Sequence, residues 1–485
     1  MIKPFLWGRQ IVFLVFFAAF MIIIHSCDSR KRKDVLARVG NKTITIKDFK
    51  NLYAFNPHLA RISQKNTARK LMLSTLIAEQ ILAQEVDLQK STMRDSLQDM
   101  GAQYEREALI EKFWQDVIMK EVTVNDDELF ETYKQSKTRK VIVYLIYPDK
   151  QSAQAAYRQY QAGVTFNELA EAMNLPATAL PIDTVSMEFQ LPFFEQAVLN
   201  LEIGQVSEPL KVNQRYYLVK CIGQQVEAGL SRSEFQKQRQ KLAKQLRRFK
   251  GQQVFIRYRQ ENLPAEPYHL NRSVFKKMVQ ILEPQAVQDH STGLQSNANQ
   301  SMDRAFVSSE LWPESLMNET VATFADGRSL SVEALGKRLA LAPYPLLTES
   351  KAQFRASVIK AVKNILDDEL IASEARKYGL HKTKDVQRQK SMWMDYARFR
   401  TGIRQIVPDS LSGERANRMV ESWLLQKLPE YDIEVNALML DTLTVHRTDM
   451  VSIKQHFPGR TIAPIIQPLM SFDRWHAKMN TYFEQ

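Results

Sequence analysis

Glycine and cysteine are scarce in this 485-residue chain, and each shortage excludes a class of protein. There are only 15 glycines, and no segment matches the Gly-x-Gly-x-x-Gly or Gly-x-x-x-x-Gly-Lys-Ser/Thr loops that bind phosphates, which disfavours nucleotide chemistry. Two cysteines, Cys27 and Cys221, cannot form a disulfide framework or a multi-cysteine zinc site. The composition, with 44% hydrophobic and 25% charged residues, is typical of a globular chain, and this length predicts several domains of about 100–200 residues each.

The N-terminus has the features of an export signal. Lys3 and Arg9 precede an apolar run at 11–24, which has the length of a signal-peptide core and is short for a membrane span of about 20 residues. The run ends in Ile-His-Ser-Cys27, which resembles a bacterial lipobox, whose cysteine is lipidated. An uncleaved anchor is the alternative, but the basic cluster at 30–33 argues against it, because positive charge tends to stay cytoplasmic. We therefore expect a lipid-anchored protein that faces the periplasm of a bacterial cell envelope.

The net charge of +12 has a local source. Residues 231–260 hold ten basic side chains and one acid, and apolar residues recur among them at Phe235, Leu242, Leu246 and Phe249. This spacing predicts a helix with one apolar stripe. The simplest interpretation is a packing helix with a solvated cationic face, and contact with anionic lipid is the sharper alternative. We expect no nucleic-acid partner, because no recognition motif accompanies the charge.

An internal repeat is visible in the sequence. Residues 36–49 read as a strand, a turn, a second strand and a helix start, and residues 321–335 repeat this order about 286 positions later. Each copy leads into a long helical pattern that ends in the related segments 81–85 and 370–374. These similarities predict a duplicated helical module.

The periodicity changes between the two copies. Residues 140–147 and 215–222 read as strands, and residues 152–162 read as a helix between them. The segment 289–304 is rich in Ser, Asn, Gln and Gly and is the best linker in the chain. The sequence therefore predicts a small α/β domain flanked by helical segments.

Motifs in this α/β domain resemble those of parvulin-type peptidyl-prolyl isomerases. Residues 162–170 match the family's Gly-x-x-Phe-x-x-Leu-Ala helix start. Residues 191–197 (Leu-Pro-Phe-Phe-Glu-Gln-Ala) match its Pro-Phe before an acidic or amide pair, and residues 201–210 match its Leu-x-x-Gly-x-apolar-Ser-x-Pro run. The opening at Leu36 resembles the N-terminal chaperone module of SurA-type and PrsA-type foldases. The resemblance covers most of residues 36–262 and, more faintly, the second module.

This resemblance implies an α+β fold in which duplicated SurA-like helical chaperone modules flank one parvulin-like α/β domain. It places a parvulin-like domain at 136–226 between helical segments. The expected organisation is a lipoprotein signal peptide at 1–26, an N-terminal helical chaperone module at 27–135, the parvulin-like domain at 136–226, a basic helix and return segment packing on the chaperone module at 229–285, a linker at 286–307, a second SurA-like module at 308–445 and a C-terminal tail at 446–485.

The resemblance also implies where an isomerase pocket belongs, and the sequence departs from the family there. Parvulins carry one histidine on the first strand and one on the last, and this chain has Tyr144 and Tyr217 at those places. Phe194 is the candidate seat for a proline ring, and Leu191 stands at the edge of the same motif. The alternative is that the three aromatic residues are plain core. We name these four residues as a degenerate peptide-binding pocket and no residue as catalytic.

These features together predict a membrane-tethered extracytoplasmic chaperone. Its partners are unfolded or nascent exported polypeptides, its membrane contact is the lipid on Cys27, and its parvulin-like domain has weak or lost activity. Two alternatives stay open, namely a working isomerase with an altered polar network and a structural adaptor of an envelope complex. We expect no cofactor and no metal.

Overall fold

The computed structural model divides into two compact units. Unit 1 comprises residues 1–113 and 266–485, and unit 2 comprises residues 114–265. The expected signal peptide at 1–26, the expected lipidation site Cys27 and residues 289–307 of the expected linker lie outside the described residues. The structure describes residues 34–54, 56, 58–59, 62, 64–86, 91–227, 231–288, 312–341, 344, 346–347, 350–445, 464, 466 and 468–484.

Unit 2 is built on a four-stranded antiparallel sheet in the order β4-β3-β6-β5. The central strands are β3 (Thr138–Tyr147) and β6 (Arg215–Val226), which two apolar stretches of the sequence predict. The edge strands are the shorter β4 (Ile182–Val185) and β5 (Leu210–Val212). Because side chains alternate along a strand, β3 and β6 present one set of apolar residues to each face of the sheet.

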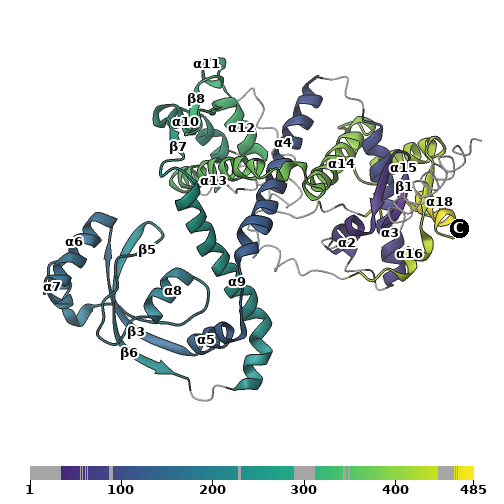
Figure 1. The fold of residues 1–485 in the computed structure, drawn as a ribbon. Coiled ribbons are helices and arrows are strands. Elements are labelled where there is room, and N and C mark those ends of the chain that lie inside the picture. Colours follow the sequence, from purple (N-terminus) through teal and green to yellow (C-terminus); the bar gives the residue numbers. More distant parts are fainter. Residues whose placement is uncertain are drawn as a thin grey trace, which may run out of the picture. The chain divides into compact units, whose positions relative to one another are not determined.

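Helices cover both faces of this sheet (Figure 1). On one face, α6 (Lys150–Gln161) and α7 (Phe166–Glu171) bury their apolar sides against a core that includes Leu145 and Leu218. On the opposite face lies α8 (Pro192–Leu199), which begins at a proline, a residue that suits the first helical turn. This arrangement confirms the expected α+β fold.

The basic helix α9 (Arg232–Asn262) is a packing helix of unit 2. Phe235, Leu242 and Phe249 are buried, and Phe235 and Leu242 lie in a cluster with residues of α5 (Asp126–Ser136). The apolar stripe of the sequence therefore faces the protein, as its simplest interpretation requires. The short helical turns of this unit are η2 (Trp114–Ile118), η3 (Met119–Glu121) and η4 (Ala177–Ala179).

Unit 1 contains the same arrangement twice, namely an antiparallel hairpin, a short helix and a long helix. Both hairpins have a register irregularity just after their first paired residue, Val35 in one and Thr320 in the other. The hydroxyls of Thr45 and Ser331 accept the backbone N–H of the residue three places ahead, which caps the short helices. The first copy comprises β1 (Val35–Val39), β2 (Lys42–Thr45), α2 (Ile46–Ala54) and α3 (Lys65–Gln84), and the second comprises β8 (Thr320–Phe324), β9 (Ser329–Ser331), α12 (Val332–Leu341) and α13 (Lys351–Lys377).

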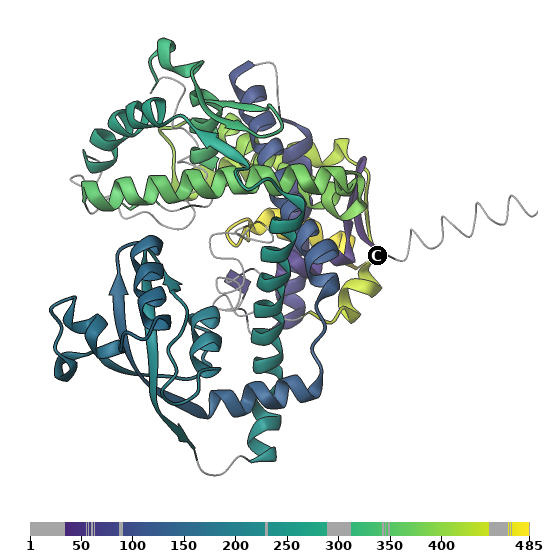
Figure 2. The same cartoon turned by 60° about the vertical axis from the view of Figure 1, so that its left-hand side comes forward.

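The two copies exchange their next helices. Helix α4 (Ser91–Phe113) follows the first copy in the sequence but packs mainly against α13 and α14. Helix α14 (Lys384–Ile406) follows the second copy and packs mainly against α4 and α3. Figure 2 shows α13 as a long green helix beside the second hairpin. The first copy therefore packs against α14, which follows the second copy in the sequence. The second copy packs against α4, which follows the first copy.

A third strand completes each hairpin. Strand β10 (Ile433–Val435) pairs with β1, and β7 (Tyr268–Leu270) pairs with β8. The return segment after the basic helix was expected on the N-terminal module, and the structure corrects this expectation. The outer edge of β1 is occupied by β10, and α10 (Arg272–Gln288) buries Val274 and Met278 in the core of the second copy.

The expected tail at 446–485 contains a buried helix, α18 (Asp473–Phe483). Trp475, Met479 and Phe483 are spaced by four residues, which is a helical period, and they join the core of the first copy. None of the described helices is long and apolar enough to cross a membrane. The other helices of unit 1 are α11 (Glu314–Met317), η9 (Leu380–Lys382), α15 (Gly413–Lys427), η10 (Leu428–Glu430) and α16 (Ala437–Thr442).

Candidate functional site

Three aromatic side chains meet on the face of the unit 2 sheet that α8 covers. The ring centroids of Tyr144 and Tyr217 lie 5.7 Å apart, and those of Phe194 and Tyr217 lie 6.1 Å apart in an edge-to-face arrangement. All three are half-buried, and they pack on one cluster whose buried members include Val219 and Cys221. We call Tyr144, Phe194 and Tyr217 the aromatic trio.

Strand alternation explains why the two tyrosines meet. Tyr144 pairs with Val219 and Ile146 pairs with Tyr217, so Tyr144 and Tyr217 lie on neighbouring strands two residues out of register. Residues two apart along a strand point to the same face. The structure therefore brings together the two positions at which the family resemblance places its histidines.

The loop before α8 is held by Glu195, whose role the sequence analysis did not identify. Its carboxylate is buried and accepts the backbone N–H groups of Glu188, Phe189, Gln190 and Leu191 at 2.7–3.0 Å. Charged acceptors make strong hydrogen bonds, so this one side chain fixes the loop that leads to Phe194. The sequence feature that could have indicated this role is the single acid within the largely apolar segment 191–199.

Leu191 does not belong to the aromatic trio. It stands at the start of α8 with 46% of its surface exposed, and it lies outside the apolar cluster that holds the trio. Cys27, the expected lipidation site, lies outside the described residues. Three of the four predicted pocket residues therefore come together, and the fourth lies at the surface.

The aromatic trio offers ring faces and two hydroxyl groups. Tyrosine hydroxyls can donate and accept hydrogen bonds, but they do not supply the two nitrogens of an imidazole. Rotation about an X–Pro bond needs no nucleophile, only a site that favours the twisted amide over its planar forms. The trio could thus seat a proline ring without a histidine network. Within the described part of the chain, no group of three His, Cys, Asp or Glu residues could hold a metal ion.

Comparison with protein-family models identifies unit 2. Residues 127–252 match the family described as the PPIC-type PPIASE domain. The chain carries a PPIC-type rotamase domain. The match begins in α5 and ends in α9, so it takes in the flanking helix pair as well as the sheet.

The chain with this PPIC-type domain is also similar to foldases. It is 22% identical over 239 residues to the foldase protein PrsA of Caldanaerobacter subterraneus subsp. tengcongensis, covering 41% of this chain and 77% of that protein. It is 22% identical over 204 residues to the foldase protein PrsA of Geobacillus sp. (strain WCH70), covering 39% of this chain and 71% of that protein. The chain is therefore similar to PrsA foldases over about two fifths of its length.

The chain is also similar to two solved structures, the peptidylprolyl isomerase PrsA from Bacillus anthracis and PrsA from Bacillus subtilis. The one from Bacillus anthracis has 14% sequence identity and a TM-score of 0.19, and covers 39% of this chain and 96% of that one. The one from Bacillus subtilis has 17% sequence identity and a TM-score of 0.16, and covers 47% of this chain and 93% of that one.

Proposed function

We propose that the protein is a membrane-tethered foldase that binds unfolded exported polypeptides and whose PPIC-type domain has weak or no isomerase activity. The similarity to PrsA foldases supports unfolded polypeptides as its clients. The aromatic trio is the main observation in support of weak isomerase activity. A tyrosine stands on each strand where the family resemblance calls for a histidine, and the hydroxyls cannot replace the imidazole network.

The experiment is NMR exchange between the cis and trans X–Pro resonances of a short peptide. The uncatalysed exchange takes tens to hundreds of seconds because the amide barrier is about 18–20 kcal/mol, so even weak catalysis is measurable. We expect little added exchange with the full chain, together with suppressed aggregation of an unfolded client. Strong catalysis that Phe194→Ala removes and Phe193→Ala keeps would favour a working isomerase. Binding to one folded partner alone, without any effect on unfolded clients, would favour an adaptor.

Tethering through Cys27 is part of the same proposal. The support is the lipobox-like sequence Ile-His-Ser-Cys27 at the end of an apolar run. Expression with a radiolabelled fatty acid should label the wild-type chain and leave Cys27→Ser unlabelled, and the variant should move from the membrane to the soluble fraction. Equal labelling of both chains, or a variant that stays in the membrane, would contradict lipid tethering.

Contact between α9 and anionic lipid is a second candidate, which the distribution of its charges favours. Arg239, Lys250 and Arg257 flank the apolar stripe and form ion pairs with acids of the same unit. Lys237, Lys241 and Lys244 are exposed and lie four and three residues apart, on the side of the helix away from the buried stripe. A row of exposed lysines attracts anionic headgroups, each contributing about 1 kcal/mol near such a surface.

Vesicle sedimentation tests this contact with a matched pair of variants. Both carry Cys27→Ser to remove lipidation, and one adds Lys241→Gln and Lys244→Gln on α9. The other adds Lys360→Gln and Lys363→Gln, two exposed lysines of α13. We expect binding to anionic vesicles to fall only with the α9 pair, and equal binding by both would contradict the contact.

A further inference from the structure

A small pocket in unit 1 lies between α4 and α12 and has a volume of about 200 Å³, enough for several water molecules or one small ion. The two helices pack against each other (Figure 1), although α4 follows the first copy of the repeat and α12 belongs to the second. The charged residues that line the pocket are Asp99, Arg106, Glu333, Lys337 and Arg338.

These lining charges form two groups. Asp99 and Glu333 both lie beside Lys337, at 3.3 and 3.2 Å from its Nζ atom, so each acid has a cation next to it. Arg106 and Arg338 pair with neither acid. Their only ion pairs in the described part of the chain are with an acid of α13 that lies outside the lining. The two arginines therefore form a charge group of their own.

Glu369 of α13 is the acid that they contact, and three arginines share it. Arg106 and Arg328 each donate a hydrogen bond to it at 2.9 Å, one to each carboxylate oxygen. The Nη1 atom of Arg338 lies 3.0 Å from the oxygen that Arg106 uses, and it makes no hydrogen bond there. A carboxylate has about four acceptor sites, whereas each guanidinium has five N–H donors, so one acid cannot satisfy three arginines.

Arg338 is the arginine that lacks an acceptor. Arg106 also donates to Gln103 at 2.5 Å, and Arg328 also donates to Asp326 at 2.8 Å. Arg338 donates no hydrogen bond to any described residue, and among its three nitrogens only Nη1 is enclosed without a partner. Its Nε and Nη2 atoms therefore keep accessible surface, in a side chain that lines the pocket and is 21% exposed.

The surroundings of Arg338 hold an excess of positive charge. Burial is the first cause that lowers the pKa of Arg338, and the charges of Arg106 and Arg328 add to the effect. Glu369 opposes these causes without cancelling them. A negative ligand beside the guanidinium would offset the excess.

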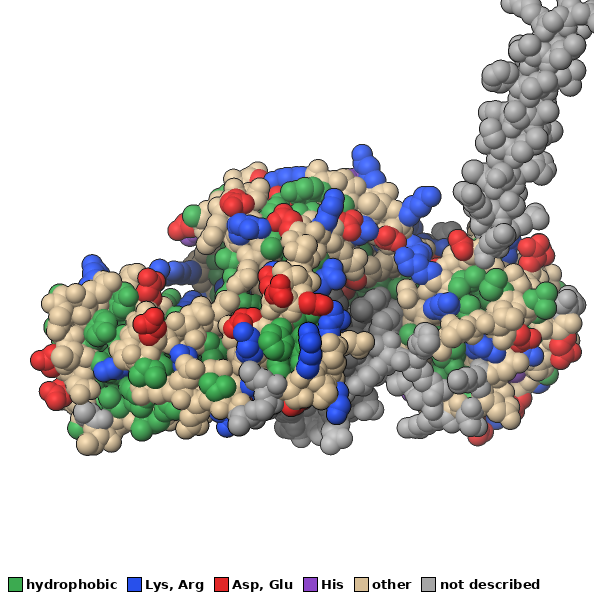
Figure 3. Space-filling model, turned by 60° about the horizontal axis from the view of Figure 1, so that its bottom comes forward, with side chains coloured by type: hydrophobic (Ala, Val, Ile, Leu, Met, Phe, Trp, Pro, Cys, Tyr) green, Lys and Arg blue, Asp and Glu red, His purple; other side chains and the backbone are tan. Residues whose placement is uncertain are grey.

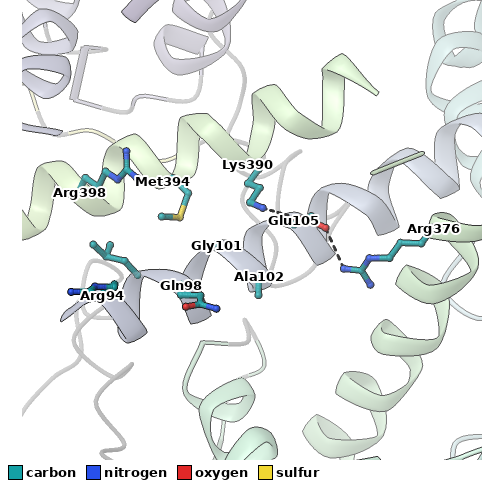
Figure 4. Close-up of a pocket in the computed structure, with 10 residues that line it drawn as sticks. Arg94, Gln98, Gly101, Ala102, Glu105, Arg376, Lys390, Met394 and Arg398 are labelled. Carbon is teal, nitrogen blue, oxygen red and sulfur yellow. Dashed lines mark hydrogen bonds and ion pairs between the residues drawn. The ribbon is translucent and has the colours of Figure 1, made fainter. Parts of the chain in front are cut away.

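A second pocket on α4 shows the contrast (Figure 4). There Glu105 accepts hydrogen bonds from Lys390 at 2.5 Å and from Arg376 at 3.3 Å, one on each oxygen. Both of these cations are hydrogen-bonded to their acid, whereas one of the three around Glu369 is not. On the face of the molecule drawn in Figure 3, basic and acidic side chains are interspersed. The excess of arginines beside α12 is therefore a local feature.

We propose that the pocket between α4 and α12 binds one small oxyanion, for which inorganic phosphate is the probe, on Nε and Nη2 of Arg338. A planar guanidinium matches two oxygens of such an anion, which makes the contact stronger and more specific than that of a single charge. The anion supplies the acceptor that Glu369 cannot supply, and it lies between α4 and a helix of the second copy. This site goes beyond the proposed foldase function and does not depend on it.

Equilibrium dialysis of the full chain against radiolabelled inorganic phosphate tests the site, at an ionic strength held constant with chloride. We expect saturable binding of a single phosphate per chain. Arg338→Gln should weaken this binding about tenfold or more, because it removes a pair of charged donors. The matched control, Lys241→Gln with Lys244→Gln, removes two exposed lysines of α9 and should bind phosphate like the wild type.

Thermal unfolding gives a second readout of the same site. A ligand that binds only the folded chain stabilises it, so phosphate should raise the unfolding midpoint of the wild type but not that of Arg338→Gln. In chloride alone, Arg338→Gln should unfold no earlier than the wild type, because the substitution removes one of the three cations around Glu369.

Two results would overturn the site. One is the absence of saturable phosphate binding by the wild-type chain, which needs no variant and so holds even if Arg338→Gln does not fold. The other is an equal loss of binding in Arg338→Gln and in the α9 control, which would place the phosphate elsewhere. Suppression of client aggregation in phosphate-free buffer measures the proposed foldase function separately, since that result survives failure of the oxyanion site.

Discussion

The two copies of the repeat in unit 1 each have a buried cluster of charged side chains at corresponding positions. Acids are in excess in one cluster and arginines are in excess in the other. Lys42 and Arg328 both stand just after the hairpin turn, 286 positions apart, and each pairs with a buried acid on a helix. Lys42 meets Asp395 of α14 at 2.9 Å, near the buried Glu79 of α3. One cation there faces two acids. We call this group the acidic junction.

The arginine junction of the second copy has the reverse balance. Glu369 of α13 lies within 2.9–3.0 Å of nitrogens of Arg106, Arg328 and Arg338. One acid there faces three cations. In both junctions one ion pair joins residues of different copies, because α4 and α14 are exchanged. The same backbone arrangement is thus compatible with an excess of acids or an excess of arginines. In each junction, one ion pair links the two copies.

The pKa shifts follow this difference. Burial, then the charge of Asp395, raises the pKa of Glu79, and Lys42 only partly opposes them. Burial also acts to raise the pKa of Glu369, but its three arginines outweigh that effect and lower it. Burial and the charge of Arg106 lower the pKa of Arg338 to about 10. The surplus acid therefore favours the protonated form of Glu79 in the acidic junction, whereas three cations share one carboxylate in the arginine junction.

The exchange of helices predicts that half of unit 1 does not fold alone. Residues 266–485 hold the second hairpin and α13 but lack α4, and their α14 and β10 lack α3 and β1. We expect this fragment to show no cooperative unfolding by circular dichroism. Co-expression with residues 34–265 should restore it. A fragment that unfolds cooperatively by itself would break the account of two mutually dependent copies.

Glu369→Gln should be the most harmful single change in either junction. It leaves three arginines around a neutral side chain, and unpairing a buried charge typically destabilises by about 3–5 kcal/mol. Urea unfolding at pH 7 measures the loss. Glu434→Gln is the control, since Glu434 is 70% exposed in its pair with Arg38, and it should change stability by about 0.5 kcal/mol or less. Equal losses would contradict the arginine junction.

Glu79→Gln should have the opposite sign. A carboxyl whose pKa is raised in the fold contributes most stability below its unfolded pKa of about 4.3, and that contribution is lost as pH rises through the folded value. The substitution should therefore stabilise the chain at pH 7 by about 1–2 kcal/mol. The gain should vanish near pH 4. Urea midpoints across this pH range check the prediction, and a gain that is independent of pH would contradict it.

Removing each hairpin cation separately sharpens the comparison further. Lys42→Gln leaves Asp395 without its partner beside Glu79, whereas Arg328→Gln leaves Glu369 with two arginines. At pH 7 we expect Lys42→Gln to destabilise by about 1–3 kcal/mol and Arg328→Gln by about 1 kcal/mol or less. Thermal unfolding of both variants measures the difference. A larger loss of stability with Arg328→Gln than with Lys42→Gln would contradict the excess of arginines in the second junction.

Much of the fold follows from local patterns in the sequence. Period-two and apolar runs predict β3 and β6, the repeated strand-turn-strand order predicts both hairpins, and the spacing of Phe235, Leu242 and Phe249 predicts the buried side of α9. The family resemblance placed Tyr144, Phe194 and Tyr217 in one pocket, and the structure brings them together.

The remainder depends on contacts that local patterns do not encode. Nothing in the composition of α4 says that it packs on α13, because its apolar residues would suit either copy. Strands β7 and β10 are three residues long, too short for a periodic signal. Glu195 acts through backbone N–H groups of its own loop, which the sequence does not display.

The most direct test of the proposed function measures client aggregation and prolyl exchange in the same preparation. The account predicts that the wild-type chain suppresses aggregation of an unfolded client and that Phe194→Ala suppresses it equally well. It also predicts that Tyr144→His with Tyr217→His raises the exchange rate above that of the wild type. Loss of aggregation suppression in Phe194→Ala, with wild-type exchange already strong, would contradict the account.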